Sequence, residues 1–155
     1  MLNDIFHLDA DAPSRYHRWL TAMHEAGHAV VGLHVGVWPQ ALRLESADGR
    51  YGWTRFQHGR LPQEMRWAVG MVAIAGAAAE SIVNPFDFPE LGGEDLEVLE
   101  RVGLDGDDDR DCLHDAAVDV LHRRRRLHFR LARLAYDTGH VHGDDMAALY
   151  IRADR

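Results

Sequence analysis

The chain has 155 residues, with 17 basic and 25 acidic residues and a formal net charge of −8. Since a domain usually has roughly 100–200 residues, we expect one domain over residues 1–155, with residues 1–12 as a flexible tail. Hydrophobic residues make up 46% and charged residues 27%, which excludes a wholly disordered chain and a fibrous repeat. The net negative charge argues against a protein whose main role is to bind nucleic acid.

The histidine and cysteine counts limit the kind of metal site that the chain can form. There are 11 histidines and a single cysteine, Cys112. One cysteine excludes an internal disulfide and a zinc cluster built from thiolates. Any zinc would therefore be held by imidazole nitrogens, the commonest protein ligands of metals, and by carboxylates.

No targeting segment is evident in the sequence. The N-terminal residues MLNDIFHLDADAPSRYH are acidic and lack the basic start and apolar run of a signal peptide. The most apolar stretch, residues 67–79, is shorter than the roughly 20 residues needed to cross a bilayer. It predicts a core helix, so we expect a cytoplasmic protein without a membrane span.

The first predicted elements are a helix and a β-hairpin. The helix runs from about residue 11 to about residue 37 and is apolar on most of its circumference, which indicates a buried helix. Residues 41–45 and 51–57 alternate between apolar and polar side chains, and Asp48-Gly49 between them favours a tight turn. Together they predict two antiparallel strands.

The rest of the chain predicts helices. They are expected over residues 62–83, 94–102, 107–136 and 143–152. The third of them contains four consecutive arginines, Arg123 to Arg126, of which Arg124 falls on the stripe that faces the core. A solvated helix face is the usual interpretation of such a run, and a surface for an anionic partner is the alternative.

The segment His24-Glu25-Ala26-Gly27-His28 has the pattern HExxH and lies on the first predicted helix. Residues four apart lie on the same face of a helix, one turn apart, so the two imidazoles can bind one ion. Glu25 lies about 100° round the helix, from where it can reach a water molecule at the metal. The pattern predicts His24 and His28 as metal ligands and Glu25 as a catalytic base.

A catalytic zinc ion usually has three protein ligands and one open position, so a third ligand is required. His34 follows His28 by six residues and could bind only if the helix broke near Gly32. Glu80, at the end of the long apolar helix, and Asp95, at the start of the short helix, are the other candidates. The residue pattern alone does not separate Glu80 from Asp95.

The sequence resembles the FtsH-type proteases, which are ATP-dependent zinc proteases of bacteria and organelles. Residues 23–32, MHEAGHAVVG, are similar to the zinc helix of that family. Residues 51–54 resemble its Gly-x-Thr strand, residues 75–80 its Gly-Gly-Arg-x-Ala-Glu helix, and residues 93–96 its Asn-Asp-Leu/Ile site. Residues 118–143 resemble the last helices of the family, so the likeness is collinear.

The resemblance covers the chain from about Trp19 to the C-terminus. It implies a mainly α, helical zincin-like peptidase domain with a small β-hairpin or sheet beside the zinc helix. It also implies Zn²⁺ held by His24, His28 and Asp95, because the family's aspartate is its third zinc ligand, and Glu25 as general base. Since these 155 residues contain no counterpart of the family's ATPase domain or membrane anchor, hydrolysis is expected to need no ATP.

The expected function is a zinc metalloendopeptidase that cleaves peptides or unfolded proteins. A separate unfoldase and a homo-oligomer are partners that the sequence leaves open, together with the natural substrate and the cleavage specificity. The alternative function is a catalytically inactive, zinc-stabilised protein-interaction module. Glu25 argues against that alternative, because a structural zinc site needs no base.

Overall fold

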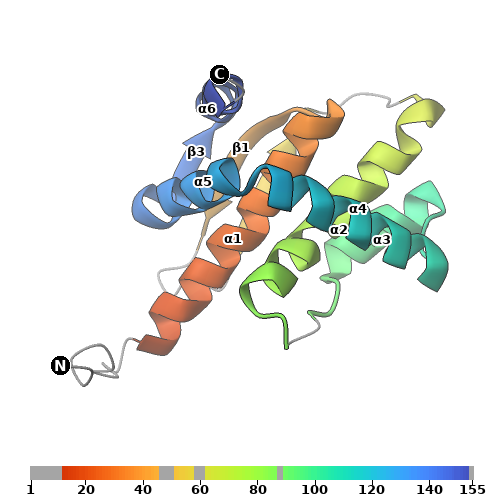
Figure 1. The fold of residues 1–155 in the computed structure, drawn as a ribbon, viewed down its shortest axis with the longest axis horizontal. Coiled ribbons are helices and arrows are strands. Elements are labelled where there is room, and N and C mark those ends of the chain that lie inside the picture. Colours follow the sequence, from red (N-terminus) through yellow and green to blue (C-terminus); the bar gives the residue numbers. More distant parts are fainter. Residues whose placement is uncertain (1–11, 46–50, 58–61, 87–88, 154–155) are drawn as a thin grey trace.

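Two long helices form the centre of the molecule (Figure 1). The computed structural model describes residues 12–45, 51–57, 62–86 and 89–153. Helix α1 (Ala12–Val35) packs along α2 (Arg66–Val83), α4 (Asp107–Arg123) packs on α2, and α5 (Arg125–Thr138) packs on α1. The described chain is therefore mainly helical, as the sequence predicts.

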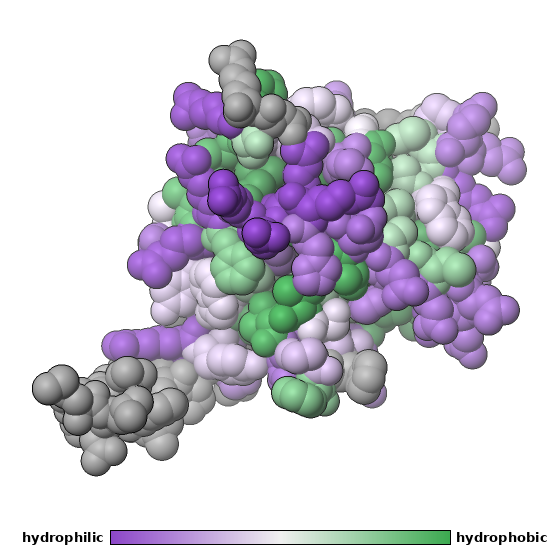
Figure 2. All heavy atoms as spheres, in the orientation of Figure 1, coloured by the Kyte–Doolittle hydropathy of each residue, from purple (hydrophilic) through white to green (hydrophobic). Residues whose placement is uncertain are grey.

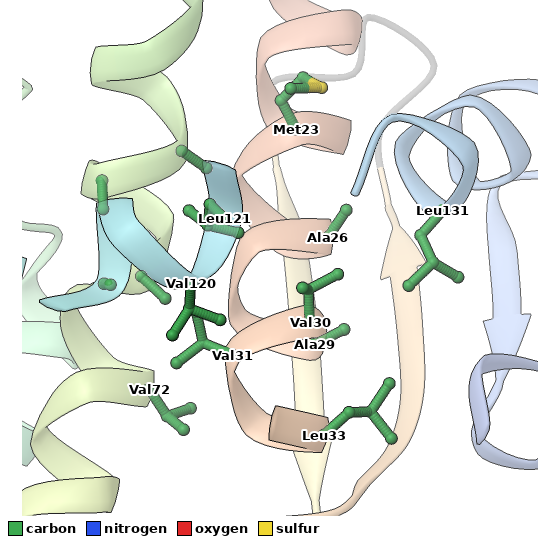
Figure 3. Close-up of a cluster of buried hydrophobic side chains, with 14 of the residues drawn as sticks. Met23, Ala26, Ala29, Val30, Val31, Leu33, Val72, Val120, Leu121 and Leu131 are labelled. Carbon is green, nitrogen blue, oxygen red and sulfur yellow. The ribbon is translucent and has the colours of Figure 1, made fainter. Parts of the chain in front are cut away.

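Helix α1 contributes side chains to the core on nearly all its sides. Those buried include Ala22, Met23, Ala26, Ala29, Val30, Val31 and Leu33. Figure 3 shows side chains of neighbouring helices gathered round them, among them Val72 and Leu131. The predicted buried helix is confirmed from Ala22 onward, whereas residues 15–17 are exposed. The helix ends slightly before residue 37 because Gly36 adopts a left-handed conformation with φ +83°.

A three-stranded antiparallel sheet lies beside α1 in the described chain. Strand β1 (Pro39–Leu44) pairs with β2 (Gly52–Phe56) on one side and with β3 (His140–His142) on the other, so β2 and β3 are the two edges. The predicted hairpin is confirmed, although its turn signal Asp48-Gly49 lies outside the described residues. The sequence does not predict β3, since three residues are too few to show an alternation.

The helix predicted over residues 107–136 is wrong in one respect, because the structure divides it at Arg124. This residue has φ −103° and ψ 22°, which ends α4 and begins α5. The two halves pack mainly on different helices, α4 on α2 and α5 on α1. The Arg124 guanidinium lies 4.9 Å from the centre of the Tyr150 ring on α6 (Gly143–Ala153), so the bend also joins α6 to the bundle.

The other predicted helices are confirmed to within a few residues. Helices α3 (Gly93–Val102) and α6 occupy almost the expected ranges. The 3₁₀ turn η1 (Gln63–Met65) precedes α2, where one continuous helix was expected directly after Pro62. The predicted flexible tail falls outside the described residues, apart from Ala12.

Residues 63–83, which comprise η1 and α2, are long and apolar enough to cross a membrane by length and composition. However, residues 70–79 of α2 are all buried within the protein, where α1 and α4 pack against the helix. This burial agrees with the predicted core helix.

Buried His128 fixes α5 to the part of α1 that precedes the HExxH residues. Its side chain is 1% exposed, and Nε2 donates a hydrogen bond to the carbonyl oxygen of Met23 at 2.8 Å. Burial lowers the pKa of His128 below 6.5, and the hydrogen bond to Met23 opposes this only in part. The unfolded chain therefore takes up this proton more readily, so the stabilising contribution is complete above about pH 6.5 and is lost as the pH falls.

We expect His128→Gln to weaken the acid sensitivity of the fold, because a glutamine amide can still donate to Met23 but does not titrate. Between about pH 7.5 and about pH 5.5, the wild-type free energy of unfolding should fall by up to about 1.4 kcal/mol more than that of the variant. Urea unfolding at both pH values measures the difference, with exposed His122→Gln as the control. Equal pH dependence in the wild type and His128→Gln would contradict this role.

Candidate metal centre

Helix α1 places His24 and His28 one turn apart, with both rings facing the same space. The ring centroids are 4.7 Å apart at an interplanar angle of 73°, and the two Nε2 atoms are 3.0 Å apart. His28 is 7% exposed and buried with the core residues of α1. The two imidazoles therefore lie on one face of α1, as the HExxH spacing predicts.

Helix α2 orients both imidazoles. Nδ1 of His28 donates to the carbonyl oxygen of Val72 at 2.6 Å, and Nδ1 of His24 donates to Oε1 of Glu80 at 2.6 Å. A carbonyl oxygen can only accept, so the proton of neutral His28 is on Nδ1 and its Nε2 keeps a free electron pair. Such hydrogen bonds at the remote nitrogen are the usual support of metal-binding histidines.

Small residues allow α1 and α2 to lie this close together. A Cβ atom on Gly76 of α2 would be 2.3 Å from Nε2 of His24, and one on Gly27 of α1 would be 2.7 Å from the carbonyl oxygen of Ala75. Real Cβ atoms do not come this close, so a larger residue would displace the His24 ring at Gly76 and would push α1 and α2 apart at Gly27. Gly76 is a site residue that the sequence pattern does not single out by its chemistry, since glycine has no ligand atom.

Asp95 brings the third donor from the first turn of α3. Its Oδ2 lies 3.6 Å from Nε2 of His24 and 3.6 Å from Nε2 of His28. In tetrahedral coordination at about 2 Å, ligand atoms are roughly 3.3 Å apart. The three separations in this group are close to that value, so the donors fit zinc by both type and spacing.

The alternative third ligands take other positions. Glu80 contacts the remote Nδ1 of His24 rather than Nε2, so it acts as a support for that imidazole. His34 is exposed on the last turn of α1, which continues unbroken to Val35, so the break that His34 would need does not occur. Among the described residues, His24, His28 and Asp95 form the one group of three or more histidine, cysteine or carboxylate ligands that could hold a metal ion.

Glu25 lies between α1 and the edge strand β2, and its side chain is 6% exposed. The Thr54 hydroxyl is 2.8 Å from Oε2 of Glu25 and 3.0 Å from the Glu25 backbone oxygen, and it can donate to either. A Cβ on Gly52 would be 2.9 Å from Cγ of Glu25, so the strand can approach closely only with glycine there. Sequence reasoning missed the contact of Thr54 with Glu25, although the spacing of Gly52 and Thr54 puts both on one face of the strand.

Negative charge surrounds His24. Burial by itself lowers the pKa of this imidazole, but contacts with Asp95 and Glu80 and the charges of Glu25 and Glu80 outweigh burial and raise the pKa to about 10. The same carboxylates attract a metal cation, which would compete with the proton for the imidazole electron pair. The electrostatics of the centre are therefore those of a cation site.

All four predicted site residues line one open cleft of about 1100 Å³. Its walls come from α1, β2, α2 and α3, and they combine the polar site with apolar side chains that include Val37, Phe56, Val69, Val72 and Val98. The cleft is large enough to hold several residues of a peptide beside the three donors.

No protein-family model matches the sequence, and no curated protein matches it significantly. The residues of the site are therefore the basis on which a function can be assigned.

We expect Gly76→Ala to displace the His24 ring, because the new methyl group would occupy the same space. Zinc affinity should fall about tenfold or more, measured by competition with a chromophoric chelator. Gly70→Ala is the matched control on α2, since its methyl group would meet only the flexible ends of Leu104 and Leu113. Wild-type affinity in Gly76→Ala would show that the ring has room to move.

Removal of the Glu80 carboxylate should weaken metal binding through His24. We expect Glu80→Ala to lower zinc affinity about 10- to 100-fold and Glu80→Gln to lower it less, because the glutamine oxygen can still accept from Nδ1. Isothermal titration at fixed pH measures both values. Glu100→Ala, an exposed change on α3, should leave the affinity unchanged, and an equal loss there would argue against a specific role of Glu80.

Proposed function

We propose that this protein is a zinc-dependent metalloendopeptidase, related to the FtsH-type proteases and built as a zincin-like domain, which cleaves peptides or unfolded chains without ATP. The observation that supports it most is the position of Glu25. This carboxylate lines the same open cleft as the three donors and is held by Thr54, whereas a purely structural zinc site usually closes with a fourth protein ligand.

His24, His28 and Asp95 would hold the zinc ion. When bound, zinc supplies Lewis acidity that activates water and polarises a peptide carbonyl. Glu25 accepts the proton from the attacking water and delivers it to the leaving amine, so that one C–O bond forms and the peptide C–N bond breaks. The Thr54 hydroxyl limits the motion of Glu25, which keeps the carboxylate at the cleft surface beside the reacting groups.

The edge of the sheet supplies a means to hold the substrate. Strand β2 is an edge strand of the described sheet, and its residues Gly52, Thr54 and Phe56 line the cleft. An extended peptide can pair with the backbone groups of such an edge, which requires no particular side chains. Peptides, loose termini and chains delivered by a separate unfoldase offer extended segments most readily, so they are the proposed substrates.

We expect Glu25→Gln to lose about 10²- to 10⁴-fold in the rate of peptide hydrolysis and to retain zinc, because the amide cannot accept the proton and the three donors are unchanged. Cleavage of a fluorogenic peptide and metal analysis of the purified protein test the two parts. Glu94→Gln, which changes an exposed carboxylate of the same cleft, is the control and should keep most activity.

Two results would overturn the proposal. Hydrolysis at the wild-type rate in Glu25→Gln would remove Glu25 from the chemistry. Bound zinc with no hydrolysis by the wild-type protein in any assembly state would instead favour the zinc-stabilised interaction module.

A further inference from the structure

A second pair of neighbouring histidines lies on β3, away from the cleft. His140 and His142 alternate with Val141, which is 1% exposed and packs in the core. Because successive side chains of a strand point to opposite faces, both imidazoles must lie on the outer face of the sheet. Both are exposed, and neither lines the cleft that contains the first centre.

The backbone of this pair is well fixed. His140 pairs with Arg43 and His142 with Ala41 across the sheet. Before the strand, the Thr138 hydroxyl is 2.8 Å from the His140 carbonyl oxygen and 2.7 Å from that of Leu134, and it can donate to either. After it, Gly143 lies so close to β1 that a Cβ would be 2.5 Å from the carbonyl oxygen of Pro39. Two ligands on a fixed strand lose little backbone freedom when they bind one ion.

The two rings are close neighbours. Their centroids are 4.3 Å apart at an interplanar angle of 62°, compared with 4.7 Å and 73° for His24 and His28. Two imidazoles bound to one ion at about 2 Å have centroids roughly 4.4 Å apart at a 90° angle and roughly 5.1 Å apart at the tetrahedral angle. The 4.3 Å separation on β3 is close to the lower of these values, so both imidazoles can reach one ion.

We propose that His140 and His142 form a second metal site for divalent transition ions that bind imidazole, such as Ni²⁺ and Cu²⁺. Water completes the coordination of the ion on the exposed side. Mg²⁺ and Ca²⁺ do not fit, because they require oxygen ligands. The site is independent of the proposed peptidase function, since it shares no residue with the first centre.

The surroundings limit its affinity. Arg43 of β1 lies opposite His140 on the same face. Arg55 of β2 pairs with Ala41 of β1 and also lies on this face. Two guanidinium groups therefore share this face with the ion. Their repulsion is weakened by solvent but not removed. Arg43→Gln should therefore tighten binding about threefold, while weaker or unchanged binding would contradict an ion placed beside His140.

Titration of the full chain with Ni²⁺, after one equivalent of zinc has been added for the first centre, tests the proposal. The wild type should show one further Ni²⁺ site by calorimetry and should be retained on an immobilised Ni²⁺ matrix. His140→Ala and His142→Ala should each lower the affinity of that site about tenfold or more, because each leaves a single ligand in place of a chelate. The double variant His140→Ala/His142→Ala should bind Ni²⁺ only slightly more weakly than either single variant.

The control is the double variant His34→Ala/His122→Ala, which removes two exposed imidazoles that lie on different helices. It should keep the second site. The proposal is overturned if the wild type binds no Ni²⁺ beyond the first centre, or if the control loses as much Ni²⁺ affinity as the β3 variants. It is also overturned if His140→Ala and His142→Ala each lower the Ni²⁺ affinity only about twofold and their effects add in the double variant. Circular dichroism of each variant shows that the fold is retained.

Discussion

The close contact between α1 and α2 determines the geometry of the site. Each histidine of α1 is fixed by an acceptor on α2, at Val72 and Glu80, and Gly76 leaves the space that the His24 ring fills. If the two helices were further apart, both imidazoles would lose their orientation together. The packing of α1 against α2 therefore also sets the orientation of the two imidazoles. This close packing explains why glycine and alanine are so frequent in the middle of α2.

Features set by local spacing could be predicted from the sequence. The pairing of His24 with His28 follows from the helical repeat, and the buried character of α1 and α2 follows from their apolar residues. The choice between Asp95 and Glu80 could not be made from the residue pattern, because it depends on how α3 meets α1. Both carboxylates approach His24, and only the three-dimensional arrangement shows that they face different nitrogens of the ring.

The features that escaped prediction have a common cause. The break at Arg124 arises because α4 and α5 pack on different helices, while the residues on either side of it favour helix. Strand β3 forms because β1 offers it a partner, and Thr54 gains its role because β2 passes beside Glu25. In each case a contact between distant segments decides the structure, and no local pattern of residues contains that information.

Strand β2 has an open edge in the described sheet, with Arg55 exposed near its centre. Unpaired backbone groups along an edge are a template for any extended chain, including the same strand of another molecule. Two copies of β2 laid side by side would bring their arginines close together on one face, and that repulsion opposes self-assembly. Among the described residues no further strand pairs with this edge, so its backbone groups remain accessible to an extended chain while the charge of Arg55 disfavours a second copy of β2.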